Sequence, residues 1–588
     1  MQAIRLRAAL AAGLTLSGVI VAQARAWDNS PLTGPVVRHS YHCGAHDRPE
    51  PGLQGQVPKA DQRDGDAKKG YNCGLELVGF TPLAKTVDRH DSRPNDNANL
   101  SWAGSCAYVS GAQAQLFHSP LGKAPTRGKR GGPGIAVVDV HNPAHPRMVR
   151  ILRMPGAVAT SETINAITKP DGTAILVVGE YGNDPVSYRK PMDIYTYNTH
   201  DPNCAHLRHI PNPTHPKSLA TYYWPTNIHN LTVTPDGNYV YATIPIQAID
   251  LRRFWQHARS PKAASYITYV GNLDKAIGGA PDGVGPLTDL VPENFQPIHP
   301  FIATENSHEA YATDDKTVYI GGQTPIGDLF TIINVRNWLA SDGKQRAQVI
   351  GQYAGRGHSI RGATINGHHY LLHSEESVFG GAYGCVPQVA NPIAGAAQPF
   401  LTNIDDPTHP RTVSEMGLEI NQPENCLTQI KDGENDSVHY HDVDSATDTH
   451  FVMASMWNAG IRVFDVRNPA LPTEVAYFNS ADVAGKGQPT LLDQDWGHIH
   501  YIPQLGELWF ASEHGGFYVL RLEDQVRHQL ALPPVSSSAP RSHLVDGVDA
   551  GWPGTTGLHY LRYTLADIAT TSQFYCTIAP YTQQPAVH

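Results

Sequence analysis

The chain has 588 residues, 40% of them hydrophobic, and a formal net charge of -10 when histidine is neutral. A chain of this length and composition can bury a large core. Its acidic balance, with no strong basic cluster, argues against nucleic acid or an anionic membrane surface as a partner.

The first 26 residues have the features of a secretory signal peptide. Arg5 and Arg7 precede an apolar run over residues 8–22, and alanines at positions 22, 24 and 26 form a cleavage site before Trp27. We therefore expect residues 1–26 to be removed and the mature protein to be periplasmic or secreted. No later apolar stretch reaches the roughly 18 residues of a membrane span.

A phrase of β-branched residues recurs at long intervals. It reads Gly-Ile-Ala-Val-Val-Asp-Val at 134–140 and Gly-Ile-Arg-Val-Phe-Asp-Val at 460–466, and Asn-Pro follows each copy after one residue. A strand that ends in this way predicts a tight hairpin. Weaker copies begin at residues 193, 247, 329, 400 and 516, which gives seven units.

Each unit predicts four strands. An opening strand such as 229–234 meets a turn, a second strand such as 239–243 follows, and then come the phrase strand and a fourth strand such as 147–152. Four strands repeated seven times predict an all-β fold, a seven-bladed β-propeller over residues 71–530.

The phrase resembles the repeat of the LVIVD-repeat proteins, and this resemblance covers most of residues 70–525. It implies a propeller and leaves the activity open.

Two extensions flank the predicted propeller, an arm over residues 27–70 and a C-terminal segment over residues 531–588. The arm is rich in Pro, Gly, Asp and Lys, which suits an extended segment that wraps the surface. A strand from this arm, or from residues 558–563, is expected to complete the terminal blade and close the ring.

Seven cysteines are widely spaced, and none forms a Cys-x-x-Cys pair that would suit a thiolate zinc site. In an exported chain they predict disulfides between blades and extensions, with at least one thiol left over. The cysteines are Cys43, Cys73, Cys106, Cys204, Cys385, Cys426 and Cys576.

Five units carry a histidine at the same opening position, six residues ahead of the first turn. The first strand of each blade lines the central channel of a propeller, so a shared position predicts a ring of imidazoles around the axis. In the two leading units, Glu162 or Thr163 and Asn72 or Cys73 are expected near this position. The ring histidines are His229, His308, His358, His439 and His498.

Further polar residues are expected beside this ring. His441 and His500 follow ring histidines by two residues, so strand alternation predicts that they face the channel one layer deeper. The loops between second and third strands should open at the same mouth of the channel. They contribute Glu180, His373, Glu375, Trp457, Glu513 and His514.

Neutral imidazoles on rigid strands suit copper, iron, zinc and nickel, and nearby carboxylates can orient the rings. The sequence therefore predicts a transition-metal site built from these nine histidines. Glu180, Glu375 and Glu513 are the candidate catalytic residues, which would orient ligands or move protons. The segment Met453–Val466 is similar to a blade of the selenium-binding-protein and methanethiol-oxidase family, which implies an exported copper-dependent oxidase.

These observations favour a metal-dependent oxidoreductase that uses copper or iron, with zinc as a further candidate, on a small-molecule substrate. The alternative is a non-catalytic secreted or periplasmic propeller that presents its loops to a protein or carbohydrate. In that case the ring histidines would bond sideways to the repeated Asp of their own blade, Asp139 or Asp465. The two hypotheses differ in whether the imidazoles point inward at a common depth.

Overall fold

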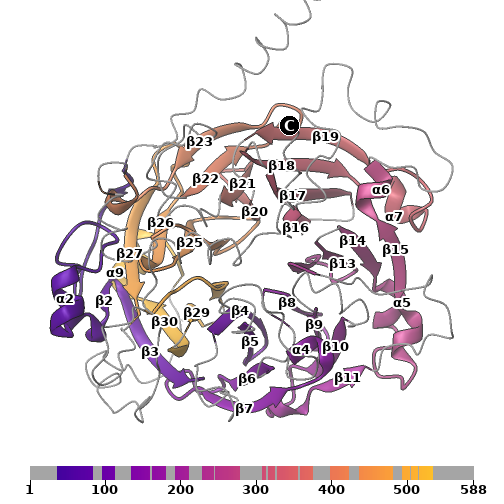
Figure 1. Ribbon diagram of the computed structural model, residues 1–588, viewed down its shortest axis with the longest axis horizontal. Coiled ribbons are helices and arrows are strands. Elements are labelled where there is room, and N and C mark those ends of the chain that lie inside the picture. The colour runs from indigo at the N-terminus through magenta and orange to yellow at the C-terminus, as the bar shows by residue number, and fades with distance from the viewer. Residues whose placement is uncertain are drawn as a thin grey trace, which may run out of the picture.

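The computed structural model confirms the all-β, seven-bladed propeller. Seven sheets surround a central axis; six of them have four strands and the seventh has six (Figure 1). The structure describes residues 36–83, 96–112, 134–158, 160, 162–179, 192–210, 228–243, 246–277, 307–312, 316–324, 327–354, 358–374, 398–422, 425, 436–480, 493–503, 505–513 and 515–533.

The inner two strands of each blade form a hairpin. The first strands, in the order of the blades, are β4 (Asp96–Ala103), β8 (Ile164–Thr168), β12 (Leu231–Val233), β16 (Ser307–Ala312), β20 (Ser359–Ile365), β24 (Tyr440–Val443) and β28 (His500–Ile502). The second strands are β5 (Cys106–Ala112), β9 (Thr173–Val178), β13 (Tyr239–Ala242), β17 (Thr317–Thr324), β21 (His368–Ser374), β25 (Phe451–Met456) and β29 (Glu507–Ala511).

The repeated phrase occupies the third strand of all seven blades. These strands are β6 (Ile135–Asp139), β10 (Asp193–Asn198), β14 (Gln247–Asp250), β18 (Gly327–Asn334), β22 (Pro399–Asn403), β26 (Gly460–Asp465) and β30 (Gly516–Leu522). The outer strands are β7 (Arg147–Leu152), β11 (Arg208–Ile210), β15 (Thr268–Asn272), β19 (Gln348–Ala354), β23 (Arg411–Glu415), β27 (Thr473–Asn479) and β3 (Leu75–Pro82).

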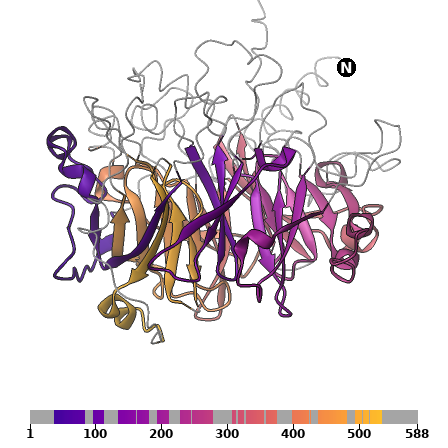
Figure 2. The ribbon, with the colours of Figure 1, turned by 90° about the horizontal axis from the view of Figure 1, so that it is seen from below.

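The ring is closed by β3, which precedes the first blade in sequence and pairs antiparallel with β30 as the outer strand of the seventh blade. The closing strand therefore comes from the N-terminal side, directly after the expected arm. The other candidate, residues 558–563, lies outside the described residues. Figure 2 shows the blades from the side, standing next to one another in a single ring.

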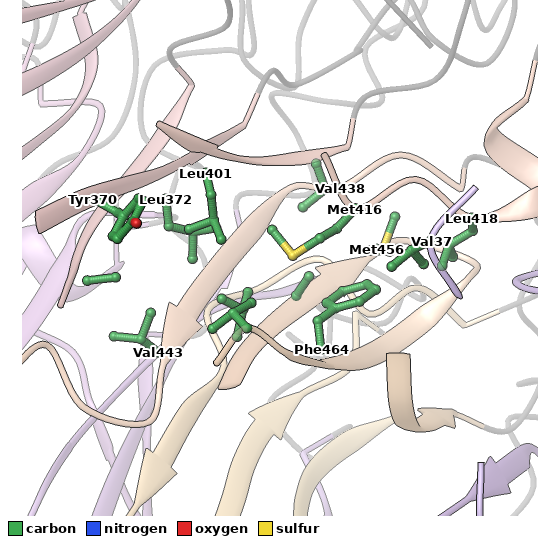
Figure 3. Packing of buried hydrophobic residues seen from close by; sticks show 14 of the residues in the cluster. Val37, Tyr370, Leu372, Leu401, Met416, Leu418, Val438, Val443, Met456 and Phe464 are labelled. Carbon is green, nitrogen blue, oxygen red and sulfur yellow. The ribbon is translucent and has the colours of Figure 1, made fainter. Parts of the chain in front are cut away.

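Among the described residues, seven clusters of buried hydrophobic side chains lie between blades, one for each pair of neighbours, and a further cluster joins the arm to the sixth blade. Figure 3 shows the cluster between the fifth and sixth blades, where Leu372 and Leu401 pack with Met456 and Phe464. Each fully buried side chain of this size contributes roughly 1.5–3 kcal/mol. Because both faces of a blade are covered, the phrase strands are continuous apolar runs rather than alternating ones.

The Asp at the end of the phrase stabilises the hairpin that follows. Asp139 Oδ1 accepts a hydrogen bond from the backbone N–H of His141 at 3.0 Å, and Asp465 Oδ1 accepts one from Arg467 at 3.0 Å. This is an Asx turn, which explains why Asp is repeated at this position. These carboxylates bond to residues of their own hairpins.

The N-terminal arm covers the outer edge of the sixth blade. Its strand β1 (Arg38–His39) and the strand β2 (Tyr71–Cys73), which directly follows the arm, both pair with β27. The fully buried guanidinium of Arg462, on β26, forms ion pairs with Glu50 of the arm and with Glu474. The arm thereby protects an edge strand from pairing with another chain.

Short helices occupy the connections and rims. They are α2 (Lys59–Asp64), η1 (Asp66–Lys69), α4 (Pro155–Val158), η3 (Cys204–His206), α5 (Arg252–Trp255), η4 (Ala263–Tyr266), α6 (Leu273–Ile277), α7 (Arg336–Ala340), η7 (Glu419–Asn421) and α9 (Asp524–Gln529). Within the described ranges, no helix has the length and apolar character needed to cross a bilayer.

Two disulfides form among the described residues, and they link segments of the kind that the sequence predicts. Cys43–Cys73 ties the arm to β2, and Cys106–Cys204 joins the first blade to η3 beside the second. The cysteines at positions 385, 426 and 576 lie outside the described residues.

Candidate metal centre in the central channel

Three of the ring histidines share a recurring backbone hydrogen bond. In three blades the histidine N–H donates to the carbonyl at or next to the end of the second strand, which fixes where the side chain enters the channel. The bonds run from His229 to Thr243 (3.2 Å), from His358 to Ser374 (2.6 Å) and from His439 to Ser455 (2.9 Å).

Four imidazoles from consecutive blades form an unbroken arc. The ring centroids of His229 and His308 are 4.3 Å apart, those of His308 and His358 are 3.5 Å apart, and those of His358 and His439 are 4.9 Å apart. All four residues are buried. The imidazoles therefore converge, as the metal-site hypothesis requires.

Glu162 supplies a carboxylate at one end of this arc. Its Oε2 lies 3.3 Å from His308 Nε2 and 3.6 Å from His229 Nε2, and one ligand atom from each of the three residues lies within 4.8 Å of the others. Glu162 is 1% exposed. The sequence analysis placed Glu162 near the ring but did not identify it as a ligand. Its position in the repeat, which corresponds to that of the ring histidines, could have indicated this role.

The residue predicted at the ring position of the first blade was wrong. Its inner strand is β4, so Asn99, rather than Asn72 or Cys73, lies at the ring. Asn99 Oδ1 accepts a hydrogen bond from His498 N, and Asn99 Nδ2 donates to the Glu162 carbonyl. Asn72 instead lies in β2, at the outer edge of the sixth blade. The repeat pattern did not indicate Asn99 because residues 113–133 separate the second and third strands of this blade, so its inner strand lies further from the phrase than in most of the other blades.

His439 is oriented by its neighbours. Its Nδ1 lies 2.7 Å from the carbonyl oxygen of Trp496, and an acceptor there requires the proton on Nδ1. The indoles of Trp457 and Trp496 stack on each other and flank the ring, with centroids 5.2 and 5.1 Å from that of His439. His439 is therefore a ligand candidate with a fixed tautomer.

His498 differs from the four histidines of the arc in its hydrogen-bond partner. Arg361 approaches its Nδ1 at 3.3 Å, so that nitrogen is the acceptor and the proton lies on Nε2. Burial, followed by the positive charge of Arg361, holds the pKa of His498 well below its usual value. With Nδ1 engaged and Nε2 protonated, His498 offers no lone pair to a metal in this arrangement.

The deeper histidines link blades instead of forming a second ligand layer. His500 Nδ1 lies 2.9 Å from Asp442 Oδ2 and its Nε2 lies 2.9 Å from the Leu100 carbonyl. Both partners are acceptors, so both bonds form only when both nitrogens carry protons. His441 Nε2 bonds to the Ser359 carbonyl at 3.1 Å, and burial lowers the pKa of His441 well below its usual value.

Strand alternation predicts that His441 and His500 face the channel in the same way as His439 and His498. However, β24 begins at Tyr440 and β28 begins at His500, so His439 and His498 lie before these strands and the alternation does not extend to them.

Tyr440 is fully buried and links three blades through its hydroxyl. The side chain starts on β24 in the sixth blade, and its hydroxyl donates to Glu162 Oε2 in the second blade at 2.5 Å. Asn230 Nδ2 in the third blade donates to the same hydroxyl at 3.0 Å.

The other predicted residues are dispersed. His373 lies between blades, with its Nε2 2.7 Å from Thr402 Oγ1 and its ring stacked on Phe400, away from the arc. Glu513 is buried, and its carbonyl accepts a hydrogen bond from the backbone N–H of Asn97 at the start of β4. The remaining predicted residues, Glu180, Glu375 and His514, lie outside the described residues.

Two other groups of potential ligands contain disulfide-bonded cysteines, whose sulfurs are not thiolates. They are Cys43 with Asp47 and Cys73, and Cys204 with Asp139 and His141. Among the described residues, the group of Glu162, His229 and His308 is therefore the one that retains all its ligands.

No protein-family model matches the chain, and no curated protein matches it. Solved structures resemble it at low identity. Sqt1 from Chaetomium thermophilum matches with 8% identity and a TM-score of 0.40 over 77% of this chain and 99% of that chain. An ancestral GH74 enzyme matches with 9% identity and a TM-score of 0.40 over 82% of this chain and 51% of that chain.

The β-propeller domain of Cps50 (Swd1) from Myceliophteria thermophila matches with 10% identity and a TM-score of 0.38 over 76% of this chain and 100% of that domain. Similarities this distant carry no argument about what this chain does. The assignment as a seven-bladed propeller rests on the seven sheets of the structure itself.

Proposed function

We propose that the protein is an exported, metal-dependent oxidoreductase whose metal is held in the channel by Glu162, His229 and His308. The observation that carries the proposal is the convergence of two imidazoles and one carboxylate, all three residues buried, within 4.8 Å of one another. Such a buried set of polar groups is costly to maintain without a role.

The donor set favours iron or copper. Two histidines and one carboxylate with open positions are the ligands of non-haem Fe(II) oxygenases, and imidazole also suits copper and zinc. The similarity of Met453–Val466 to the selenium-binding-protein and methanethiol-oxidase family favours copper, and the LVIVD resemblance fits the repeat. A metal bound here would serve to activate oxygen or to polarise a substrate.

The surrounding residues have supporting roles in this proposal. His358 and His439 continue the arc beyond His308 and provide further nitrogen donors on the same side of the channel. Glu513 is proposed to transfer protons between the site and solvent. Export is supported by the predicted signal peptide and by two disulfides, which suit an oxidising compartment.

Elemental analysis of the protein purified from its own cells tests the proposal. We expect near-stoichiometric copper or iron in the wild type and its loss in Glu162→Gln and His308→Ala variants that keep the wild-type circular dichroism. His409→Ala, which changes an exposed turn histidine, is the matched control and should retain the metal. N-terminal sequencing of the same sample should begin at Trp27.

Oxygen uptake with small thiols and phenols then separates an oxidase from a protein that only stores metal. The wild type should consume oxygen and His308→Ala should not. A metal-free wild type would refute the proposal and favour a binding propeller that presents its loops to a protein or carbohydrate.

A further inference from the structure

The side chain of Tyr440 hydrogen-bonds residues of two other blades. It is 0% exposed, and its ring centroid lies 3.8 Å from that of His498 and 4.5 Å from that of His439. Its hydroxyl meets the opposite wall, which is built from the second and third blades. In a ring of seven blades these two lie opposite the sixth (Figure 1), so the hydrogen bonds of the phenol connect opposite sides of the ring.

The hydroxyl ends at the proposed metal site. It lies 2.5 Å from Glu162 Oε2, the same oxygen that lies 3.3 Å from His308 Nε2 and 3.6 Å from His229 Nε2. The hydroxyl oxygen thus contacts the carboxylate oxygen that lies between the two histidine nitrogens and itself. Asn230 Nδ2 holds it there with a second hydrogen bond of 3.0 Å.

A site of two histidines and one carboxylate leaves at least one coordination position for another donor. We propose that the phenol oxygen of Tyr440 fills that position and is the fourth protein ligand of the metal. This inference rests on the proposed function, because it assumes that Glu162, His229 and His308 hold a metal.

Coordination of the metal by Tyr440 releases one proton. The phenol O–H bond breaks, a metal–oxygen bond forms, and the proton passes to solvent, since protein ligands bind metals in their deprotonated form. Asn230 then continues to donate its N–H to the phenolate oxygen. The alternative role for Tyr440 is that of a positioning residue, which would only hydrogen-bond Glu162 and stay protonated.

Visible absorption and resonance Raman spectroscopy of the Cu(II)-loaded wild type separate these roles. A phenolate bound to Cu(II) gives a charge-transfer band in the visible range and tyrosinate vibrations that are enhanced by excitation into that band. A phenol that only donates a hydrogen bond gives neither signal. We expect both signals, and this measurement needs no variant.

Tyr440→Phe should still bind Cu(II) through the other three ligands, with an affinity about 10–100-fold lower, and should lose the band. Tyr108→Phe, the same change at a fully buried tyrosine between the first two blades, is the matched control and should keep the band.

The outcomes are distinguishable from failure of the proposed function. A wild type that takes up stoichiometric Cu(II) without a phenolate band overturns the role of Tyr440 and leaves the metal site standing. A band that persists in Tyr440→Phe also overturns it. A wild type that binds no Cu(II) refutes the metal site itself.

Discussion

At the scale of single residues, hydrogen-bond partners decide which histidines can serve as ligands. His439 and His500 are both buried or half-buried channel histidines. His439 Nδ1 bonds to one carbonyl, whereas both nitrogens of His500 bond to acceptors. A place in the repeat brings an imidazole to the channel, and its neighbours then determine its tautomer. The useful ligand set is therefore smaller than the set of channel histidines.

Glu523 gives a prediction about pH at this scale. Burial, together with the negative charges of Asp47 and Glu76, raises the pKa of Glu523 to about 7 from 4.5. The folded protein therefore binds a proton that the unfolded chain has released, so stability falls as pH rises from about 4.5 to about 7. Glu523→Gln should match the wild type in melting temperature at pH 5 and exceed it at pH 8.

Thermal unfolding of both proteins across this range measures the effect. Asp448→Asn removes an exposed carboxylate from the sixth blade and should leave the slope unchanged. Parallel wild-type and Glu523→Gln curves would show that Glu523 does not carry the proton.

At the scale of elements, the hairpin after the phrase also packs on the preceding blade. The carbonyl oxygen of Pro143, in the first blade, would lie 2.0 Å from a Cβ built on Gly79 of β3. The Pro407 carbonyl of the fifth blade would lie 1.8 Å from a Cβ on Gly351 of β19. In both outer strands the pairing with the third strand shifts register beside the glycine. Because glycine has no Cβ, the hairpin of the next blade can approach the backbone there.

Gly79→Ala and Gly351→Ala should therefore destabilise the protein. A methyl group would meet a backbone carbonyl that cannot rotate away, which costs about 1–3 kcal/mol. Gly52→Ala is the control, because its nearest neighbour is the flexible end of the Gln56 side chain at 3.2 Å. Urea unfolding followed by tryptophan fluorescence measures the difference, and equal midpoints for all three variants would contradict the packing argument.

At the scale of the whole molecule, stability depends on closing a ring of seven blades. The chain closes it by placing β3 beside β30, so residues about 440 positions apart share one sheet. The disulfide Cys106–Cys204 adds a covalent link between the first two blades across a sequence separation of 98 residues. Long closed loops restrict the unfolded chain most, so this link should stabilise the ring.

Replacement of both Cys106 and Cys204 by Ala should lower the melting temperature more than replacement of both Cys43 and Cys73, whose separation is 30 residues. The loop-length dependence alone gives a difference of about 1 kcal/mol. Differential scanning calorimetry of the two double variants measures it. An equal or reversed order would show that local packing, not loop length, sets the contribution of each disulfide.

The sequence by itself determined the repeat, the third strand of each blade and the histidine ring, because these follow from local patterns. Strand alternation, turn residues and a repeated Asp act over a few residues, so they can be recognised without the fold. The phrase predicted the third strand of all seven blades, and the inward direction of four ring histidines followed from their place at the blade openings.

The tertiary structure decided what happens across the channel and at the closing seam. Glu162, Asn230 and Tyr440 come from three blades, and 278 residues separate Glu162 from Tyr440, so their hydrogen bonds have no local signal. The tautomer of each histidine likewise depends on partners from other blades. Chemistry at the axis of a propeller is set by side chains that meet only when the ring closes, whereas each blade is encoded within its own repeat.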